Sequence, residues 1–208
     1  MIKMLRIDDR LLHGHVVFMW TKQLNIKGII VANDELVTDP IQSLAMKLAV
    51  PEHLKLLIKT IDEAAKLIND PRAAGMNILV VMKNPVDAAR LLQKIEDKSV
   101  IERINIGNSG RIDKGDRMMM TKEVYVDDAD IAAIEEILAA GLPFEIQMIP
   151  TSNKVQVKEA LKNVRKWGSE LRKHFSKELC SQTAMPFFAV FELYFGLFLS
   201  PVQNQMHR

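Results

Sequence analysis

Two imidazoles, two carboxylates and two arginines lie within ten residues near the amino terminus. This segment, residues 6–15, reads Arg-Ile-Asp-Asp-Arg-Leu-Leu-His-Gly-His. A neutral imidazole is a good nucleophile near pH 7, because its ordinary pKa is about 6.5. A guanidinium can hold two phosphoryl oxygens with parallel hydrogen bonds. The cluster therefore indicates phosphoryl transfer, with His13 as the nucleophile and Arg10 binding the phosphoryl oxygens.

The other residues of this segment have supporting roles in the same hypothesis. Asp8 or Asp9 is expected to fix the arginine or to orient the imidazole, and spacing alone does not choose between them. Gly14 has no side chain, so backbone there can approach a bound group closely. If a helix begins near Gly14, its free N–H groups face an anion at the loop. His15 would then lie in the first helical turn with its side chain directed away from the loop, although its protonated form could offset phosphate charge below about pH 6.5.

A second polar loop follows a short predicted strand at residues 103–106. It reads Gly107-Asn108-Ser109-Gly110-Arg111, and it offers backbone N–H groups, small polar side chains and a cation. We take Asn108, Ser109 and Arg111 as candidates for phosphate binding or partner docking, and an ordinary turn is the alternative. The loop lacks the Gly-Lys-Ser/Thr of a P-loop, and the chain has no Gly-x-Gly-x-x-Gly, so nothing supports ATP or a dinucleotide.

His13 and His15 also permit a different chemistry, because a His-x-His pair after a strand can bind a divalent metal. A catalytic metal site usually needs at least three protein ligands. The remaining histidines are His53, His174 and His207, and no acidic cluster accompanies them. We therefore expect no metal, and keep a metal-dependent hydrolase as an alternative. A non-catalytic regulatory protein that binds a phosphorylated partner is the alternative outside enzymes.

Short apolar runs alternate with helix-like stretches through most of the chain. Strands are predicted at residues 1–5, 27–33, 53–59, 76–82, 103–106, 118–126 and 144–149. Helices are predicted at residues 40–50, 60–69, 84–97, from the cap at Asp127 to Gly141, and at 151–164. This alternation indicates an α/β fold, with an open, mainly parallel, twisted sheet of about seven strands and helices on both faces. Such sheets place ligands outside the carboxyl ends of their strands.

Composition divides the chain of 208 residues into two parts. Residues 1–163 hold four aromatic side chains, whereas residues 164–208 hold eight. We predict a domain at 1–163 and a carboxyl-terminal aromatic-rich extension at 164–208. The apolar stretch 184–199 is shorter than the roughly 20 residues needed to span a bilayer. A packed helix or dimer contact is the favoured interpretation, followed by a membrane contact and then by a segment not native to the domain.

Overall composition limits the classes of partner and the compartment. The net charge of +2 is too small to argue for nucleic acid binding. The single cysteine excludes an internal disulfide and agrees with a reducing compartment. The first residues lack the apolar core and small-residue cleavage site of a signal peptide. We therefore expect the protein in the cytoplasm.

Residues 6–14, followed by Val16, resemble the signature of a known family. That family is the IIB component of the mannose/fructose/sorbose (N-acetylgalactosamine-like) group of the bacterial sugar phosphotransferase system. Further similar segments are Val31-Ala-Asn-Asp34, the helix start at Asn84-Pro85, Ile104-Asn-Ile-Gly107 and Val124-Tyr-Val-Asp127. The resemblance covers residues 1–163, and its first motif is highly specific.

The resemblance implies a function and a set of partners. His13 would accept a phosphoryl group from the phosphohistidine of a IIA protein and pass it to a sugar carried by the membrane components IIC and IID. Arg10 and Asp8 align with residues around the family's phosphorylated histidine. A cytoplasmic protein, peripherally associated with membrane components and often a homodimer, is implied, with no metal or organic cofactor. Two departures are His15, where the family commonly has Gln, and the extension after residue 163.

Overall fold

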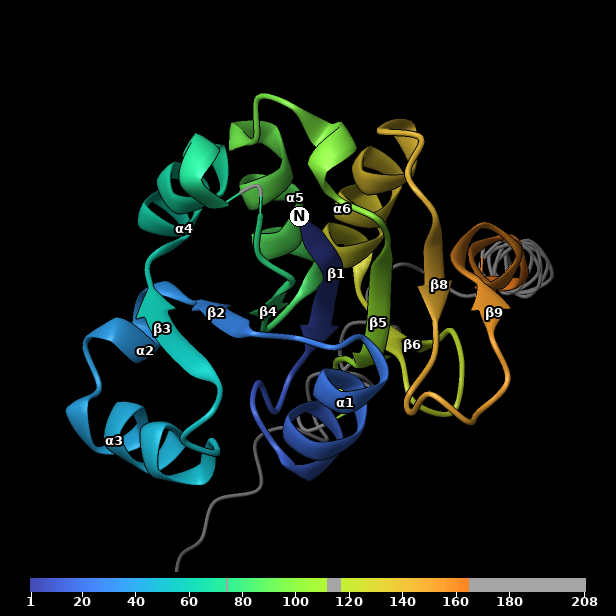
Figure 1. Ribbon diagram of the computed structural model, residues 1–208. Helices are drawn as coiled ribbons and strands as arrows, with labels where there is room; N and C mark the ends of the chain where they lie inside the picture. Colours follow the sequence, from blue (N-terminus) through green and yellow to red (C-terminus); the bar gives the residue numbers. More distant parts are fainter. Residues whose placement is uncertain (74, 112–116, 165–208) are drawn as a thin grey trace, which may run out of the picture. The chain divides into compact units, whose positions relative to one another are not determined.

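A seven-stranded sheet in the order β3-β2-β4-β1-β5-β8-β9 forms the centre of the fold (Figure 1). The computed structural model describes residues 1–73, 75–111 and 117–164. The strands are β1 (Ile2–Asp8), β2 (Gly28–Ala32), β3 (Lys55–Lys59), β4 (Ile78–Met82), β5 (Ile104–Asn108), β8 (Phe144–Ile146) and β9 (Val155–Gln156). All neighbouring strands are parallel except β8 and β9. The predicted fold class is confirmed.

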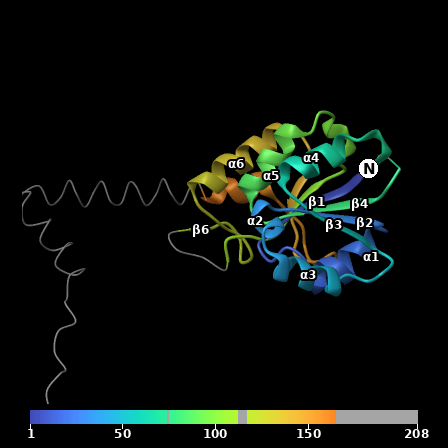
Figure 2. The same cartoon turned by 90° about the vertical axis from the view of Figure 1, so that its left-hand side faces the viewer.

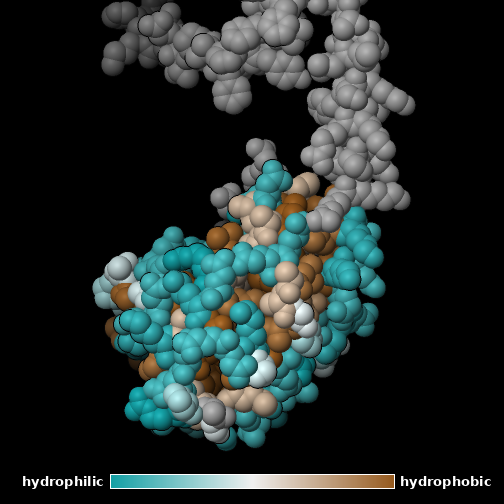
Figure 3. All heavy atoms as spheres, turned by 90° about the horizontal axis from the view of Figure 1, so that it is seen from above, coloured by the Kyte–Doolittle hydropathy of each residue, from teal (hydrophilic) through white to brown (hydrophobic). Residues whose placement is uncertain are grey.

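Helices cover both faces of this sheet. Figure 2 shows α4, α5 and α6 on one side and α1 and α3 on the other. The helices and single turns are η1 (His15–Trp20, a π-helix), α1 (Thr21–Gln23), α2 (Asp34–Val37), α3 (Pro40–Ala49), α4 (Ile61–Asn69), η2 (Pro71–Ala73), α5 (Pro85–Lys94), η3 (Lys98–Val100) and α6 (Asp128–Ala139). Figure 3 looks onto the face above α4–α6, where hydrophilic side chains predominate and hydrophobic ones show between them. Each face of the sheet has its own apolar core. Helices α4–α6 bury side chains in one core, whereas α3, on the other side, has no buried residue.

Local sequence explains where the longer helices begin. Thr60 and Asp127 each form a capping box with the residue three positions later. The Asn84 side chain accepts a hydrogen bond from the Asp87 N–H, and prolines occupy the first position of α3 and α5. The predicted starts of these helices are accordingly confirmed.

Several predicted boundaries are wrong. The single strand expected at 118–126 is a separate antiparallel pair, β6 (Met118–Met119) and β7 (Tyr125–Val126), because the chain turns back between Thr121 and Val124. The strand expected at 144–149 ends at Ile146. The helix expected at 151–164 begins at residue 157, after the antiparallel strand β9. The short helix α2, which the Asn33 side chain caps, was not predicted.

The first strand was predicted to end at residue 5, but β1 continues to Asp8. These three additional residues position the site. Leu5 and Ile7 point into the core under α4–α6, whereas Met4 points into the core under η1 and α1. Because side chains alternate along a strand, Arg6 and Asp8 share the face of Met4. The strand thus changes from apolar to charged on one face as it approaches the rim of the sheet.

The predicted extension 164–208 lies, apart from Val164, outside the described residues. Within the described ranges, no helix combines the length and apolar character needed to cross a membrane.

Candidate active site

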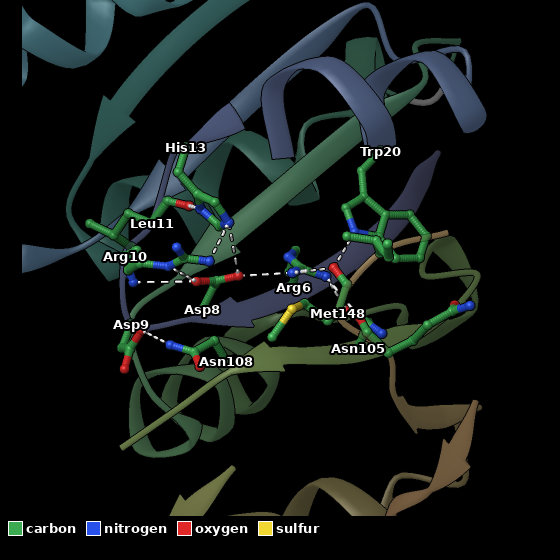
Figure 4. A network of polar contacts seen from close by, with 12 residues as sticks. Arg6, Asp8, Asp9, Arg10, Leu11, His13, Trp20, Asn105, Asn108 and Met148 are labelled. Carbon is green, nitrogen blue, oxygen red and sulfur yellow. Dashed lines mark hydrogen bonds and ion pairs between the residues drawn. The ribbon is translucent and has the colours of Figure 1, made fainter. Parts of the chain in front are cut away.

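A buried ion pair ends the first strand. Arg6 Nη2 lies 2.8 Å from Asp8 Oδ2, and both side chains are fully buried (Figure 4). Burial lowers the pKa of the Arg6 guanidinium, and the Asp8 charge opposes this effect. Removing one member of such a pair would leave an uncompensated buried charge, which typically costs about 3–5 kcal/mol.

The two terminal nitrogens of Arg6 are hydrogen-bonded to the strands and loops around them, whereas its buried Nε has no hydrogen-bond partner in the described residues. Its Nη1 donates to Asn105 Oδ1 at 2.5 Å, and its Nη2 donates to the Met148 carbonyl at 3.0 Å. The Trp20 ring lies 5.4 Å from the Arg6 guanidinium carbon, and its indole N–H donates to the same Met148 carbonyl. The guanidinium thus joins β1, β5, η1 and the loop after β8 beneath the site.

Gly107 makes room for this pair. A Cβ at Gly107 would lie 1.8 Å from Arg6 Nη2 and 2.7 Å from Asp8 Oδ2. Asn105 and Gly107 are two positions apart in β5, so both lie on the same face of the strand. That face adjoins Arg6 and Asp8 of β1. The sequence alone did not predict that Arg6, Asn105 and Gly107 meet, although a polar residue and a glycine in an otherwise apolar strand were a usable signal.

A tight turn carries the chain from Asp8 toward His13. The Leu11 N–H donates to the Asp8 carbonyl at 2.9 Å, and the Arg10 N–H donates to Asp8 Oδ1 at 3.3 Å. Leu11 has φ of 51°, a conformation that leucine rarely adopts and that usually costs about 1–3 kcal/mol. This turn directs the Leu11 carbonyl toward the His13 ring, where His13 Nδ1 lies 3.2 Å away.

His13 lies among Arg10, Asp8 and the Leu11 carbonyl. His13 Nε2 is 2.9 Å from Arg10 Nη2 and 3.9 Å from Asp8 Oδ2, as Figure 4 shows. A carbonyl only accepts and a guanidinium only donates, so these contacts place the proton on Nδ1 and the lone pair on Nε2. The structure thus brings together the three predicted catalytic residues, and it assigns to Asp8 the contact with both Arg10 and His13.

The surroundings of His13 favour the neutral ring. Burial lowers the pKa of His13 most, and the charges of Arg10 and Arg6 lower it further. The Asp8 carboxylate and the Leu11 carbonyl raise the pKa of His13, but its net pKa is still lowered. A side chain that is 16% exposed and neutral near pH 7 can act as a nucleophile toward a docked donor.

Gly14 and His15 lie where η1 begins. Gly14 is exposed and has an ordinary helical φ of −49°, and a Cβ there would meet only Phe18 Cδ2 at 4.0 Å. The glycine therefore leaves open surface beside His13. The expectation that His15 points away is wrong: its ring centroid lies 5.5 Å from that of His13. Because His13 precedes the helix, helical rotation does not separate the two rings.

The second loop meets the first at Asp9. The Asn108 side-chain amide donates to Asp9 Oδ1, and the Arg111 N–H donates to Asp9 Oδ2 at 3.3 Å. Ser109 is 1% exposed and forms backbone hydrogen bonds with Glu123 and Tyr125 instead. Asn108 and Arg111 thus lie at the rim near the His13 loop, whereas Ser109 anchors the segment around β7.

Within residues 1–73, 75–111 and 117–164, no three side chains from His, Cys, Asp and Glu cluster closely enough to hold a metal ion. The described residues offer no observation that favours the hydrolase alternative.

Comparisons with known proteins agree on one family. Residues 2–171 match the family described as the sorbose subfamily IIB component of the phosphotransferase system. A probable phosphotransferase enzyme IIB component from Streptococcus pyogenes is 36% identical over 163 residues, covering 76% of this chain and 98% of that protein. The fructose-specific EIIB component of Bacillus subtilis is 29% identical over 165 residues, and the match covers 79% of this chain and 98% of that protein.

Solved structures show the same relationship. The IIB domain of the sorbose permease from Klebsiella pneumoniae superposes with a TM-score of 0.70 at 25% identity, covering 78% of this chain and 96% of that one. An N-acetylgalactosamine IIB component from Streptococcus pyogenes gives a TM-score of 0.65 at 29% identity, with coverages of 76% and 96%. The chain therefore belongs to the sorbose subfamily of IIB components of the sugar phosphotransferase system.

Proposed function

We propose that His13 is the residue on which this chain carries a phosphoryl group. IIB components are phosphotransferases that pass a phosphoryl group from a IIA component to a sugar. The observation that supports His13 is its lowered pKa beside Arg10 and Asp8, in a partly exposed loop at the carboxyl end of β1. Phosphorylated IIA is the donor in this proposal, and the membrane components IIC and IID carry the sugar.

The residues around His13 have separate tasks in the transfer. An N–P bond forms to the His13 ring while the N–P bond of the donor phosphohistidine breaks. Both ring nitrogens of His13 have a hydrogen-bond partner in this structure, Nε2 with Arg10 and Nδ1 with the Leu11 carbonyl. The phosphoryl group must therefore replace one of these two contacts. Arg10, whose side chain is 43% exposed, then binds phosphoryl oxygens, while buried Asp8 orients Arg10 through Nε at 3.9 Å.

The exposed surface around this loop is the proposed docking area for partners. Gly14 leaves it open, and Asn108 and Arg111 lie at the neighbouring rim through their contacts with Asp9. His15, in ring contact with His13, is proposed to offset phosphate charge. Ser109 is left out of this surface because its side chain is buried.

The cellular setting in this proposal is the cytoplasmic side of the membrane, next to IIC and IID. The homodimer implied by the family resemblance stays a prediction, which sedimentation of the purified protein would test.

Incubation with a phosphorylated IIA component, followed by measurement of the intact mass, tests the proposal. We expect one phosphoryl group per chain, and none in the His13→Ala variant. His53→Ala is the matched control, because His53 is an exposed histidine that precedes β3. Unchanged labelling of His13→Ala, or no labelling of the unmodified chain, would contradict the proposal.

A further inference from the structure

Helix α3 presents its apolar side to solvent rather than to the sheet. Its side chains Ile41, Leu44 and Leu48 are 81%, 57% and 79% exposed, and no residue of the helix is buried. They recur at intervals of three and four positions, so they lie along one side of the helix. The opposite side faces the fold, where Met46 and Val50 pack against the core under η1 and α1. Large apolar side chains gathered on the outside of a domain mark an interaction surface.

The first helical segment of the chain extends this surface. Phe18 of η1 is 62% exposed. It lines a hollow together with Lys22, Lys27 and Pro51, and Pro51 is the second residue after α3. Figures 1 and 2 show α1 and α3 next to each other on the same side of the sheet. We define the α1–α3 face as the surface formed by Phe18, Ile41, Leu44 and Leu48.

Lysines border the α1–α3 face. Lys22, Lys27 and Lys47 are exposed, and none of the three forms an ion pair within the part of the chain that the structure describes. Residues 15–27 and 39–54 contain two carboxylates, Asp39 and Glu52, and Asp39 accepts hydrogen bonds from the first N–H groups of α3. The free charges at the border are therefore mainly positive. Apolar surface bordered by lysines is typical of helices that lie in an anionic lipid surface.

The composition of this side of α3 favours lipid over a protein as its partner. Ala45 and Ala49 complete the apolar side, so none of its side chains donates or accepts a hydrogen bond. A protein interface typically has about one hydrogen bond for each 100–200 Å² of its area, whereas lipid hydrocarbon requires none. IIB components work with membrane components of the same system, so a lipid surface is available to the chain.

We propose that the α1–α3 face binds the anionic lipid surface of a membrane. The apolar side chains enter the boundary between headgroups and acyl chains, and the three lysines pair with lipid phosphates. Phe18 adjoins Gly14, since a Cβ at Gly14 would lie 4.0 Å from Phe18 Cδ2, so this binding also holds the His13 loop near the membrane. The inference goes beyond the proposed function and does not depend on which histidine carries the phosphoryl group.

Flotation of the full chain with phospholipid vesicles tests the proposal. Vesicles of phosphatidylcholine mixed with phosphatidylglycerol offer an anionic surface, and vesicles of phosphatidylcholine alone offer a neutral one. We expect binding to the anionic vesicles and weaker binding to the neutral ones. Binding to the anionic vesicles should also weaken as salt is raised from about 0.1 M to about 1 M, because the Debye length falls from about 10 Å to about 3 Å.

Single substitutions locate the contact on the chain. Leu48→Gln and Ile41→Gln should each weaken binding to the anionic vesicles by about tenfold, because each removes an apolar side chain from the lipid. Lys47→Gln should weaken it by about fivefold, the effect of one lysine near an anionic surface. The matched controls are Val86→Gln on α5 and Lys66→Gln on α4, which are exposed residues of helices on the other side of the sheet. Both controls should bind like the unmodified chain.

The inference is overturned if the full chain does not bind the anionic vesicles. It is also overturned if the variants on the α1–α3 face bind as tightly as their controls, because another part of the chain would then hold the membrane. Two further measurements identify a protein partner in that case. A lower sedimentation coefficient of Leu48→Gln would show that the face binds a second copy of the chain, and slower labelling by phosphorylated IIA would show that it binds the donor.

Discussion

The protonation of His13 decides whether it can act as a nucleophile. Burial and the Arg10 charge lower its pKa, so we predict a titration midpoint below 6.5 in the unphosphorylated chain. Arg10→Gln should raise this midpoint, because it removes a neighbouring positive charge. Since the unfolded chain would bind more protons than the folded one here, the His13 contribution to stability decreases as the pH falls below about 6.5. Histidine ring resonances followed against pH check the prediction, and a midpoint above 6.5 would contradict it.

Arg10 should matter for transfer more than for folding. Its side chain is 43% exposed and contacts His13 and Asp8 at the rim. Arg10→Lys replaces a two-point guanidinium with a point charge, so we expect slower labelling by phosphorylated IIA with an unchanged unfolding transition. Rapid-quench labelling and thermal unfolding measure the two quantities. Labelling at the unmodified rate would argue against Arg10 as a phosphate ligand.

At the scale of elements, β1 and β5 hold the site together through Arg6, Asp8 and Gly107. Gly107→Ala would drive a Cβ into the buried ion pair, and we expect the free energy of unfolding to fall by about 2–5 kcal/mol. Gly28→Ala in β2 is the control, because its Cβ would meet ordinary contacts at 3.7 and 3.8 Å. Denaturant unfolding compares the two variants. Equal stabilities would show that the pair does not require the glycine.

The elements also show what the sequence could predict. His13, Arg10 and Asp8 stood out because polar residues followed an apolar run at the rim of a predicted sheet. Arg6 did not, because its importance depends on Asn105 and Gly107. These residues come about a hundred positions later in the chain and are adjacent only after β1 pairs with β5. The short strand β9 was missed for the same reason, since its pairing with β8 is a tertiary contact.

For the whole molecule, we predict that residues 1–164 suffice for carrying the phosphoryl group. Every residue assigned to the His13 site lies within this range, as do both described apolar cores. A chain ending at residue 164 should therefore unfold cooperatively and be labelled by phosphorylated IIA. Circular dichroism and intact mass provide the two readouts. Insoluble expression of the shortened chain would indicate that the extension completes the fold.

Mapping the phosphoryl group to a single histidine tests the central claim most directly. His13 and His15 are in ring contact, so a docked donor could reach either, but only His13 is held by both Arg10 and the Leu11 carbonyl. Fragmentation of the peptide that contains both histidines, under conditions that preserve phosphohistidine, should place the group on His13. His15→Gln should still be labelled, with at most a changed pH dependence. A phosphoryl group found on His15 of the unmodified chain would contradict the account.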